Sequence, residues 1–237
     1  MYAGTGVYTL SEAARLIRAP ARSIGRWLYG YAYARNSGDG RREYQSSALW
    51  TPQYSFADYG ERVIGFRDLL ELRVVREFVA HGVPLLVVRR CLDTAKQLFA
   101  KDYPFNTNRF ATDGRTIFLD VLRQGSEKEM IDLRGRQLVF RDIIKPSLYA
   151  GIEYERGFAR RWFPEVGKQR NIVIDPLQQF GKPMVTGDAV PTEALFANYL
   201  AEGATSGAIG VVARIYELPA RKVAAAVRFE EALRHAG

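Results

Sequence analysis

The feature that most constrains the fold is a short helical hinge that the chain carries twice. The stretch AARLIRAPARSI spans residues 13–24, and the stretch VARIYELPARKV spans residues 212–223. Aligned without a gap, they share five residues, at Ala14/Ala213, Arg15/Arg214, Pro20/Pro219, Ala21/Ala220 and Arg22/Arg221. In each stretch an apolar-periodic run ends just before a proline, a residue favoured at the start of a helix. The sequence therefore predicts two helix–turn–helix units, one near each end of the chain.

The first unit has the features of a DNA reader. Ser11 is the expected N-cap of its first helix, and Pro20 is the expected first position of its second helix. On that second helix Arg22, Arg26 and Tyr29 lie at i, i+4 and i+7, so they share one outer face. Arginine pairs with guanine or with phosphate, so this face suits the major groove of DNA. The alternative interpretation is a surface helix whose charges are only solvated.

The residues after this unit predict a two-stranded wing. YAYAR at residues 31–35 alternates in polarity, NSGDG is a turn cluster, and RREYQSSALW can return as the partner strand. Arginines on such a hairpin, among them Arg35, would lie beside the DNA backbone. We expect DNA contacts from the second helix and the wing together, at Arg22, Ser23, Arg26, Tyr29, Arg41 and Arg42.

A helical hairpin is predicted after the wing. The segment FRDLLELRVVREFVAHGVPLLVVRRCL, beginning at Phe66, has helical periodicity on both sides of Gly82 and Pro84, which fit a helix end and a new helix start. A single winged unit offers only about 600–1,000 Å² of DNA interface, so we expect a dimer or larger assembly on DNA. The expected pairing surface lies on the first helix of the hairpin, at Leu69, Leu72, Val75 and Val79, with the Ala-rich C-terminal helix second.

The middle of the chain predicts β structure. Turn dipeptides lie between β-rich runs at residues 113–114, 134–135 and 166–167, and each predicts a hairpin. After a Gly- and Pro-rich stretch, the chain reads as helical to its end. The predicted fold is α-rich α+β: a winged helix–turn–helix with a helical hairpin (residues 1–103), a small β-rich region (104–156) and a C-terminal three-helix domain (157–237) that resembles a helix–turn–helix.

Charge and composition narrow the function classes. The 237 residues carry 34 Lys and Arg against 26 Asp and Glu, a net charge of +8, which favours a polyanionic or acidic partner. One cysteine excludes an intrachain disulfide framework, and two separated histidines do not indicate a metal site. GKPMVTG lacks the spacing of a phosphate-binding loop. We expect no enzyme, no cofactor, no metal and no membrane span, and a cytoplasmic location without a signal peptide.

Two family resemblances rest on quoted motifs. YTLSEAARLIRAPARSIGRWL resembles the helix–turn–helix of MerR-type and excisionase-type regulators, with matches at Ala14, Ile24, Arg26 and Trp27. The helical hairpin that follows resembles the one after the wing in MerR proteins. Arg18 stands where those families usually have a turn glycine, so we expect a different turn that avoids a left-handed backbone. Arg26 lies one place later than the MerR-type arginine, closer to the excisionase pattern.

The end of the chain resembles a domain of undefined role in bacterial antitoxins encoded beside PIN-domain toxins. The matching residues include Asp175-Pro176, Gly181, Pro183, Gly187, Gly203, Ala213, Tyr216 and Val223. With the MerR-like front, the chain is similar to a VapB-type antitoxin of the kind known in mycobacteria. The resemblance implies a DNA-binding antitoxin that represses its own promoter and neutralises a PIN-type ribonuclease. Such an active site is acidic, so the expected toxin-binding residues are Arg221, Arg228 and Arg234.

The second hinge is expected to serve protein contact rather than DNA. Arg221 and Lys222 could face DNA, but the helix continues with an alanine stripe and with Glu230 and Glu231. Acids near phosphate are unfavourable, and a smooth alanine face favours helix packing. Two other functions stay open: a MerR-like regulator with a sensing C-terminal domain, and a basic interaction module that does not bind DNA.

Overall fold

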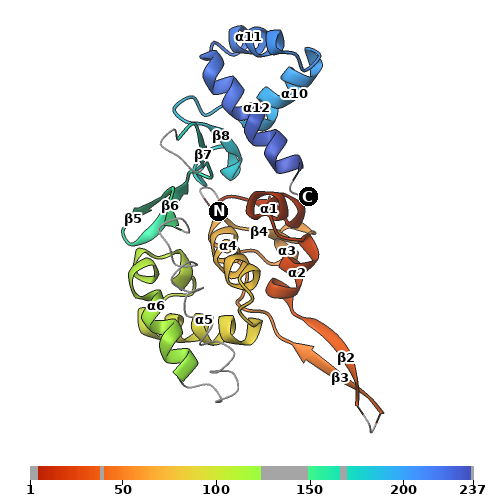
Figure 1. The fold of residues 1–237 in the computed structure, drawn as a ribbon, viewed down its shortest axis with the longest axis vertical. Helices are drawn as coiled ribbons and strands as arrows, with labels where there is room; N and C mark the ends of the chain where they lie inside the picture. Colours follow the sequence, from red (N-terminus) through yellow and green to blue (C-terminus); the bar gives the residue numbers. More distant parts are fainter. Residues whose placement is uncertain (1–4, 38–39, 124–148, 166–169, 236–237) are drawn as a thin grey trace.

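The computed structural model describes residues 5–37, 40–123, 149–165 and 170–235. Its described part is rich in helices and contains three small antiparallel sheets, which confirms the predicted α-rich α+β class. The molecule is long, with the β2–β3 wing projecting from one end and the helices α10, α11 and α12 forming the other end (Figure 1).

The N-terminal part contains the predicted helix–turn–helix and wing. Strand β1 (Tyr8–Thr9) leads into α1 (Leu10–Ile17) and α2 (Ala21–Tyr29), and β2 (Tyr31–Ser37) pairs with β3 (Gly40–Ser46). The predicted N-cap at Ser11 is wrong. Thr9 is the N-cap, because its hydroxyl accepts the Glu12 N–H at 3.2 Å while the Glu12 carboxylate accepts the Thr9 N–H at 2.8 Å.

The helical hairpin is confirmed. A short helix α3 (Phe56–Tyr59) and strand β4 (Val63–Ile64), which pairs with β1, precede α4 (Phe66–Ala80) and α5 (Leu85–Phe99). The predicted pairing surface is wrong for three of its four residues. Leu69, Leu72 and Val75 are completely buried in the core of the same chain, so a second copy could not reach them.

The predicted hairpin at Asp113-Gly114 is also wrong. Residues Asn108–Arg123 form helix α6, which follows a short 3-10 helix, η1 (Pro104–Asn106), and packs on α5. The buried residues of α6 recur at helical spacing: Phe110, Gly114, Ile117, Phe118, Val121 and Leu122. Gly114 therefore lies on the buried face of a helix and does not form a turn. The predicted hairpin at Arg134-Gly135 lies outside the described residues.

A four-stranded antiparallel sheet lies between the two ends of the molecule. Its order is β5 (Ile152–Glu155), β6 (Phe158–Trp162), β7 (Ile172–Ile174), β8 (Pro183–Val185). Strands β6 and β7 are the pair predicted around residues 166–167, although those two residues are not described. Strand β8 lies within the Gly- and Pro-rich stretch, for which the sequence pattern predicts no strand. A 3-10 helix, η2 (Gln179–Gly181), precedes it, and the domain boundary expected at residue 157 falls in the β5–β6 turn.

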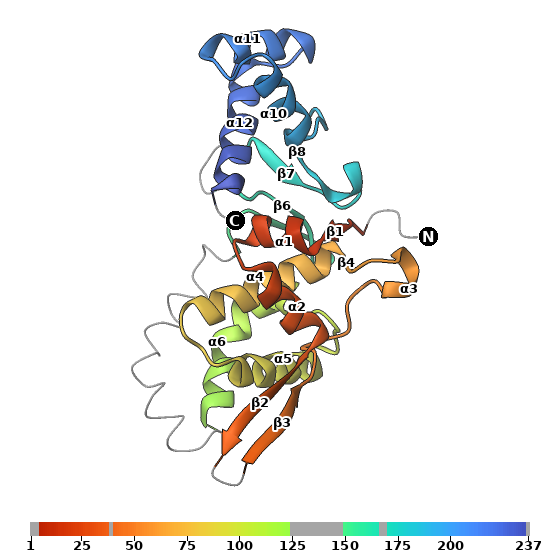
Figure 2. The ribbon, with the colours of Figure 1, turned by 90° about the vertical axis from the view of Figure 1, so that its right-hand side faces the viewer.

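The C-terminal helices are α10 (Thr192–Ala201), α11 (Ser206–Ile215) and α12 (Ala220–Arg234). They form a hydrophobic cluster of their own with Ile172 of β7 and Val185 of β8. The last turns of α12 pack on α1, so the C-terminal domain contacts the first helix of the helix–turn–helix (Figures 1 and 2). The three predicted C-terminal helices are therefore present.

Two buried acids of α4 organise the centre of the molecule. Asp68 accepts hydrogen bonds from the indole Nε1 of Trp50 at 2.8 Å, from the N–H of Gln53 at 2.9 Å and from the N–H of Gly65 at 3.0 Å. It thereby ties the chain that returns from the wing to the first turn of α4. Burial raises the pKa of Asp68, and these donors oppose the rise.

Glu71 lies one turn further along α4 and has no exposed surface. One carboxylate oxygen accepts the Phe105 N–H at 3.0 Å, and the other has no hydrogen-bond partner among the described residues. Burial raises the pKa of Glu71 well above its usual value. Protonation of Glu71 removes the negative charge that the ionised carboxylate would otherwise hold in the core with one oxygen unpaired.

This burial predicts that Glu71→Gln removes a pH dependence of stability. Because the pKa in the folded state is raised, Glu71 stabilises the fold below its unfolded pKa of about 4.3, and this contribution is lost as pH rises through the folded pKa. Gln resembles the protonated acid. The unfolding free energy of Glu71→Gln should therefore exceed that of the wild type increasingly as pH rises, by about 1.4 kcal/mol for each unit of pKa shift. Urea titrations at pH 4 to 9 measure the difference, and parallel curves would contradict the prediction.

Candidate nucleic-acid interface

The turn between α1 and α2 is left-handed at Arg18. Its backbone has φ 55° and ψ 52°, so the expectation that a non-glycine residue would avoid this region is wrong. The turn closes with hydrogen bonds from the Arg18 N–H to the Arg15 carbonyl at 3.3 Å and from the Ala19 N–H to the Ala14 carbonyl at 3.0 Å. Pro20 then caps α2, and its carbonyl accepts the Ser23 N–H at 2.8 Å. These bonds fix the angle at which α2 leaves α1.

The second hinge repeats this turn bond for bond. Glu217, at the position of Arg18, has φ 54°. Its N–H donates to the Arg214 carbonyl at 3.3 Å, and the Leu218 N–H donates to the Ala213 carbonyl at 2.9 Å. Pro219 caps α12 as Pro20 caps α2. The sequence repeat is therefore a structural repeat.

The α4–α5 corner is a third example with a glycine at the same place. Gly82 has φ 77°, the Val83 N–H donates to the Phe78 carbonyl at 2.9 Å, and Pro84 caps α5. The turn needs a left-handed residue followed by an apolar residue and a proline. Glycine fills the left-handed position in only one of these three corners, so the other two carry backbone strain.

The outer face of α2 carries the predicted arginines. Arg22 and Arg26 are exposed, while Ile24, Trp27 and Leu28 are buried beneath them. Ser23 is partly buried on the same helix. The prediction of one exposed arginine face opposite an apolar face is therefore confirmed as geometry.

Tyr29 lies at the end of this face and is half-buried. The guanidinium carbon of Arg62 lies 4.6 Å from the centre of its ring, and burial raises the pKa of the Tyr29 hydroxyl. Arg62 is exposed and precedes β4, so the fold adds a cation to this surface that the sequence reading missed. No local signal could have found it, since 33 residues separate the two positions in the chain.

The wing continues the surface of α2 through stacked aromatic rings. The Arg26 guanidinium carbon lies 4.9 Å from the Tyr31 ring centre, Tyr31 lies 5.6 Å from Tyr33, and Tyr33 stacks on Tyr44 across the hairpin at 5.4 Å. Tyr33 and Tyr44 stay exposed at 46% and 41%. Because side chains alternate along a strand, Arg42 shares this face with Tyr44, whereas Arg41 lies on the opposite face with Glu43. The predicted DNA contacts Arg41 and Arg42 therefore lie on opposite faces of the wing.

Backbone contacts hold the wing against the body. Gly30 has φ 72°, and a Cβ there would lie 2.4 Å from the Ser46 carbonyl oxygen, so only glycine fits between α2 and β2. The Arg89 guanidinium of α5 donates to the carbonyls of Ser47 and Ala48, each at 2.7 Å. The wing therefore leaves the body at a defined place.

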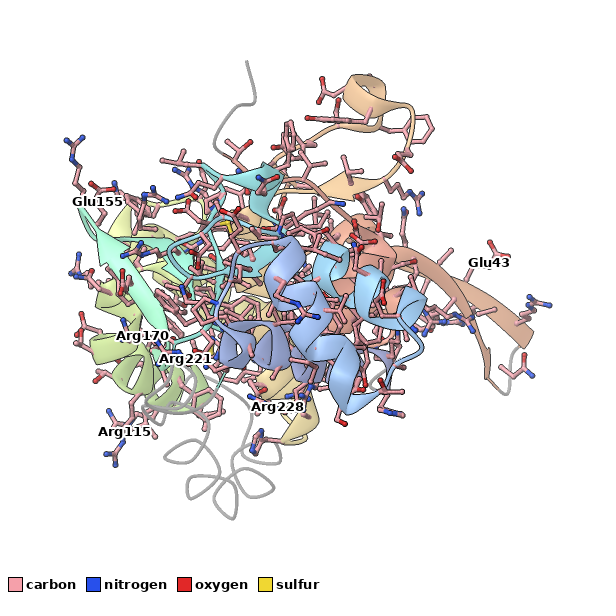
Figure 3. All side chains as sticks on the ribbon, turned by 90° about the horizontal axis from the view of Figure 1, so that it is seen from above. Glu43, Arg115, Glu155, Arg170, Arg221 and Arg228 are labelled. Carbon is pink, nitrogen blue, oxygen red and sulfur yellow. The ribbon has the colours of Figure 1, made fainter. Side chains whose placement is uncertain are left out.

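The basic residues of the second hinge lie elsewhere. Lys222 forms an ion pair with Asp188 and donates to the Thr186 carbonyl at 3.0 Å, so it braces the loop after β8. Arg221 and Arg228 are exposed and seven residues apart on α12, which puts them on one side of that helix. Seen along the long axis, they lie away from Glu43 on the wing (Figure 3). Arg234 is separate from both, since its guanidinium carbon lies 4.3 Å from the Phe196 ring centre.

The described residues show no grouping of three or more His, Cys, Asp and Glu side chains that could hold a metal ion. Cys91 is buried, and burial raises the pKa of its thiol to about 12, so it is not a nucleophile at neutral pH. Among the described helices, none combines the length and the apolar character that crossing a membrane needs.

The chain matches no family model. It is 25% identical over 194 residues, 78% of each chain, to the protein named "Putative antitoxin VapB45" of Mycobacterium tuberculosis (strain ATCC 25618 / H37Rv). This distant similarity supports an antitoxin family. The fold is shared with the X-ray crystal structure of Rv2018 from Mycobacterium tuberculosis, at a TM-score of 0.70 and 21% identity, covering 96% of this chain and all of that one.

The strained turns predict that glycine stabilises the protein at two positions. A residue with a side chain costs about 1–2 kcal/mol in the left-handed conformation, and glycine removes this strain from the folded state. Part of that gain is offset, because glycine also gives the unfolded chain more conformational freedom. Arg18→Gly and Glu217→Gly should each raise the unfolding free energy by about 0.5–1 kcal/mol. The matched change Gly82→Ala should lower it by about 1–2 kcal/mol. Chemical denaturation of the three variants measures this, and a loss of stability in Arg18→Gly would show that its backbone is not strained.

Proposed function

We propose that the protein is the antitoxin of a type II toxin–antitoxin system, which binds its own promoter DNA and neutralises a PIN-domain ribonuclease toxin. The observation that carries the DNA half is the continuous surface from Arg22 and Arg26 through Tyr31 to Tyr33, Tyr44 and Arg42. The distant antitoxin relative supports the other half. The PIN-type partner comes from the motif resemblance at the C-terminal end.

In this proposal α2 lies in the major groove. Arg22, Ser23 and Arg26 face the base edges, and Arg26 keeps its planar guanidinium oriented on the Tyr31 ring. The wing then follows the neighbouring backbone, with Arg42 at phosphate on the aromatic face and Arg41 reaching from the other face. Tyr29 contributes less directly, because Arg62 covers it, and Arg62 takes a place among the phosphate contacts. One winged unit gives a small interface, so we expect two copies on one operator.

The DNA proposal predicts different effects of arginine removal at the two hinges. Arg22→Ala and Arg26→Ala should each weaken binding to the promoter fragment by about 1–3 kcal/mol if they contact bases. If they contact only phosphate, affinity should fall equally on all duplexes, and the log–log salt slope should shrink by about 0.9 per contact. Arg221→Ala is the matched control, with an expected change within about 0.5 kcal/mol. Fluorescence anisotropy over a salt series measures all three.

An equal loss from Arg22→Ala and Arg221→Ala would show that both hinges bind DNA, against the proposal. Lys222 is unsuitable as a control, because its contacts with Asp188 and Thr186 make it part of the C-terminal fold. Light scattering of the same protein–DNA complex reports the number of copies bound.

The toxin-binding half draws on the charge of the C-terminal domain. A metal-binding nuclease site is acidic, so exposed arginines are complementary to it. Of the three predicted residues, Arg221 and Arg228 are exposed on one side of α12 and can approach such a site together. Arg234 is also exposed, but its guanidinium lies over the Phe196 ring in the cleft between α1, α10 and α12, apart from the other two arginines.

Co-expression with the product of the adjacent gene tests the antitoxin proposal. The full chain should co-purify with that product and relieve the growth arrest that it causes. Arg221→Glu with Arg228→Glu should weaken the complex, because each change replaces an attraction to an acidic site by a repulsion. Arg115→Glu on α6 is a matched control of the same chemistry far from α12, and it should leave the complex unchanged. A wild-type chain that neither binds nor rescues is not an antitoxin for that protein.

One observation favours a second candidate, a MerR-like regulator with a sensing C-terminal domain. A cleft of about 210 Å³ lies where α1 meets α10 and α12, with Leu16, Phe196 and Leu200 on its walls beside Arg15 and Glu230. A small molecule there would contact both the helix–turn–helix and the C-terminal domain. Promoter binding without any toxin interaction would favour this candidate.

A further inference from the structure

The segment between β7 and β8 holds two large apolar side chains in solvent. Phe180 is 77% exposed, the most of any large hydrophobic residue in the described chain, and Leu177 is 60% exposed. Both lie on the loop from Asp175 to Gly181, which runs beside the N-terminal strand β1 (Figure 2). Both side chains leave much of their apolar surface in contact with water.

The backbone of this loop is strained where it presents Phe180. Gln179 and Phe180 have φ values of 47° and 54°, and Gly181 follows at 80°. Two successive residues with side chains rarely adopt this left-handed region. Such a conformation persists only where surrounding contacts determine it, and it is concentrated at functional sites.

Those contacts are present at both ends of the loop. The buried carboxylate of Asp175 accepts the Leu177 N–H at 2.9 Å and the Arg160 guanidinium at 2.5 Å. At the other end, the Phe180 carbonyl accepts the Val7 N–H at 3.0 Å, and the Gly181 carbonyl accepts the Tyr8 hydroxyl at 2.9 Å. The loop is therefore a rigid support, and Phe180 is not an aromatic on a loose tip.

Gly181 is required for this arrangement. A Cβ at that position would lie 2.3 Å from the Tyr8 hydroxyl oxygen, which the loop needs as a donor. Tyr8 is itself buried in the core beside α1. The position of Phe180 is thus set by the N-terminal part of the chain, although the residue belongs to the C-terminal sequence motif.

The surface next to Leu177 is basic. Leu177 and Pro176 border an open cleft of about 420 Å³ whose other walls include Arg67, Arg156 and Arg160. Arg160 forms ion pairs with Asp175 at 2.5 Å and with Glu155 at 3.5 Å, so these three side chains together carry a charge of −1. Arg67 and Arg156 add two positive charges, which leaves the group at +1. The loop that presents Phe180 thus also borders, through Leu177, a cleft of net positive charge, and this combination fits a surface with an apolar pocket and carboxylates.

We propose that the Asp175–Gly181 loop is a preformed protein-docking anchor, which inserts Phe180 into an apolar pocket bordered by acidic groups on the toxin. This inference rests on the proposed function, and it adds a contact separate from the arginines of α12. Rigid aromatic side chains that fill a partner's pocket supply much of the binding energy of an interface, because little conformational freedom is lost. A second copy of the chain is disfavoured as the occupant, since two basic clefts would then face each other.

The test uses the full chain and the product of the adjacent gene, with affinity measured by titration calorimetry. Phe180→Ser should weaken the complex by about 30-fold or more, the loss typical of an aromatic anchor. Phe180→Tyr should retain most of the affinity, since the ring is kept. Leu98→Ser is the matched control, because Leu98 is 56% exposed on α5 and far from this loop in the sequence.

Two readouts separate the possible outcomes. Binding of each variant to the promoter fragment should equal that of the wild type, which shows that the fold is intact. Arg156→Glu should slow association with the toxin, and more so at low salt, because it reverses charge at the cleft. A wild-type complex that Phe180→Ser leaves unchanged overturns the anchor alone, whereas a wild type that forms no complex overturns the antitoxin function with it. A wild-type dimer that Phe180→Ser converts to a monomer assigns this surface to a second copy and also overturns the proposal.

Discussion

The arrangement of the N-terminal half depends on the hydrogen bonds to the buried carboxylate of Asp68. Three donors from separate parts of the chain converge on it: Trp50 after the wing, Gln53 in the following loop, and Gly65 at the start of α4. The wing leaves the body at Gly30 and returns at Trp50, so this carboxylate fixes the returning end. Removing it would leave three donors without this acceptor, two of them buried, and a buried donor left unpaired costs about 1–3 kcal/mol. The geometry of the candidate DNA surface follows from that anchoring, because α2 and the wing are adjacent through Gly30.

A single corner geometry joins three helix pairs in this protein. The left-handed residue is Arg18, Gly82 or Glu217, and in each case an apolar residue and a proline follow. The corner sets the crossing of the two helices, whatever the outer face of the second helix carries. Both second helices carry exposed arginines, Arg22 and Arg26 on α2 and Arg221 and Arg228 on α12, whereas Lys222 forms an ion pair with Asp188. The corner geometry by itself assigns no function to either hinge, so the second hinge needs its own experiment.

The two proposed activities meet at the N-terminal strand. Residues Val7 and Tyr8 hold the Phe180 loop by two hydrogen bonds, and Thr9 next to them caps α1. The last turns of α12 also pack on α1. A partner that binds Phe180 would therefore contact a loop that is hydrogen-bonded to the segment just before α1, the first helix of the helix–turn–helix. If partner binding and DNA binding favour different conformations of residues 7–9, each binding event changes the affinity of the other.

The sequence alone determined the features that local patterns encode. Helical spacing and proline placed both hinges and the α4–α5 hairpin, and alternation placed the wing. Local patterns misled at Asp113-Gly114, because a dipeptide typical of hairpin turns also fits a packed helix face, and burial of Phe110, Ile117 and Phe118 decided the outcome. Only the tertiary structure placed Arg62 on Tyr29, buried Leu69, Leu72 and Val75 away from any partner, and left Phe180 in solvent. These results depend on contacts between residues far apart in the chain. A local sequence pattern does not include the free energy of such contacts, so it could not predict them.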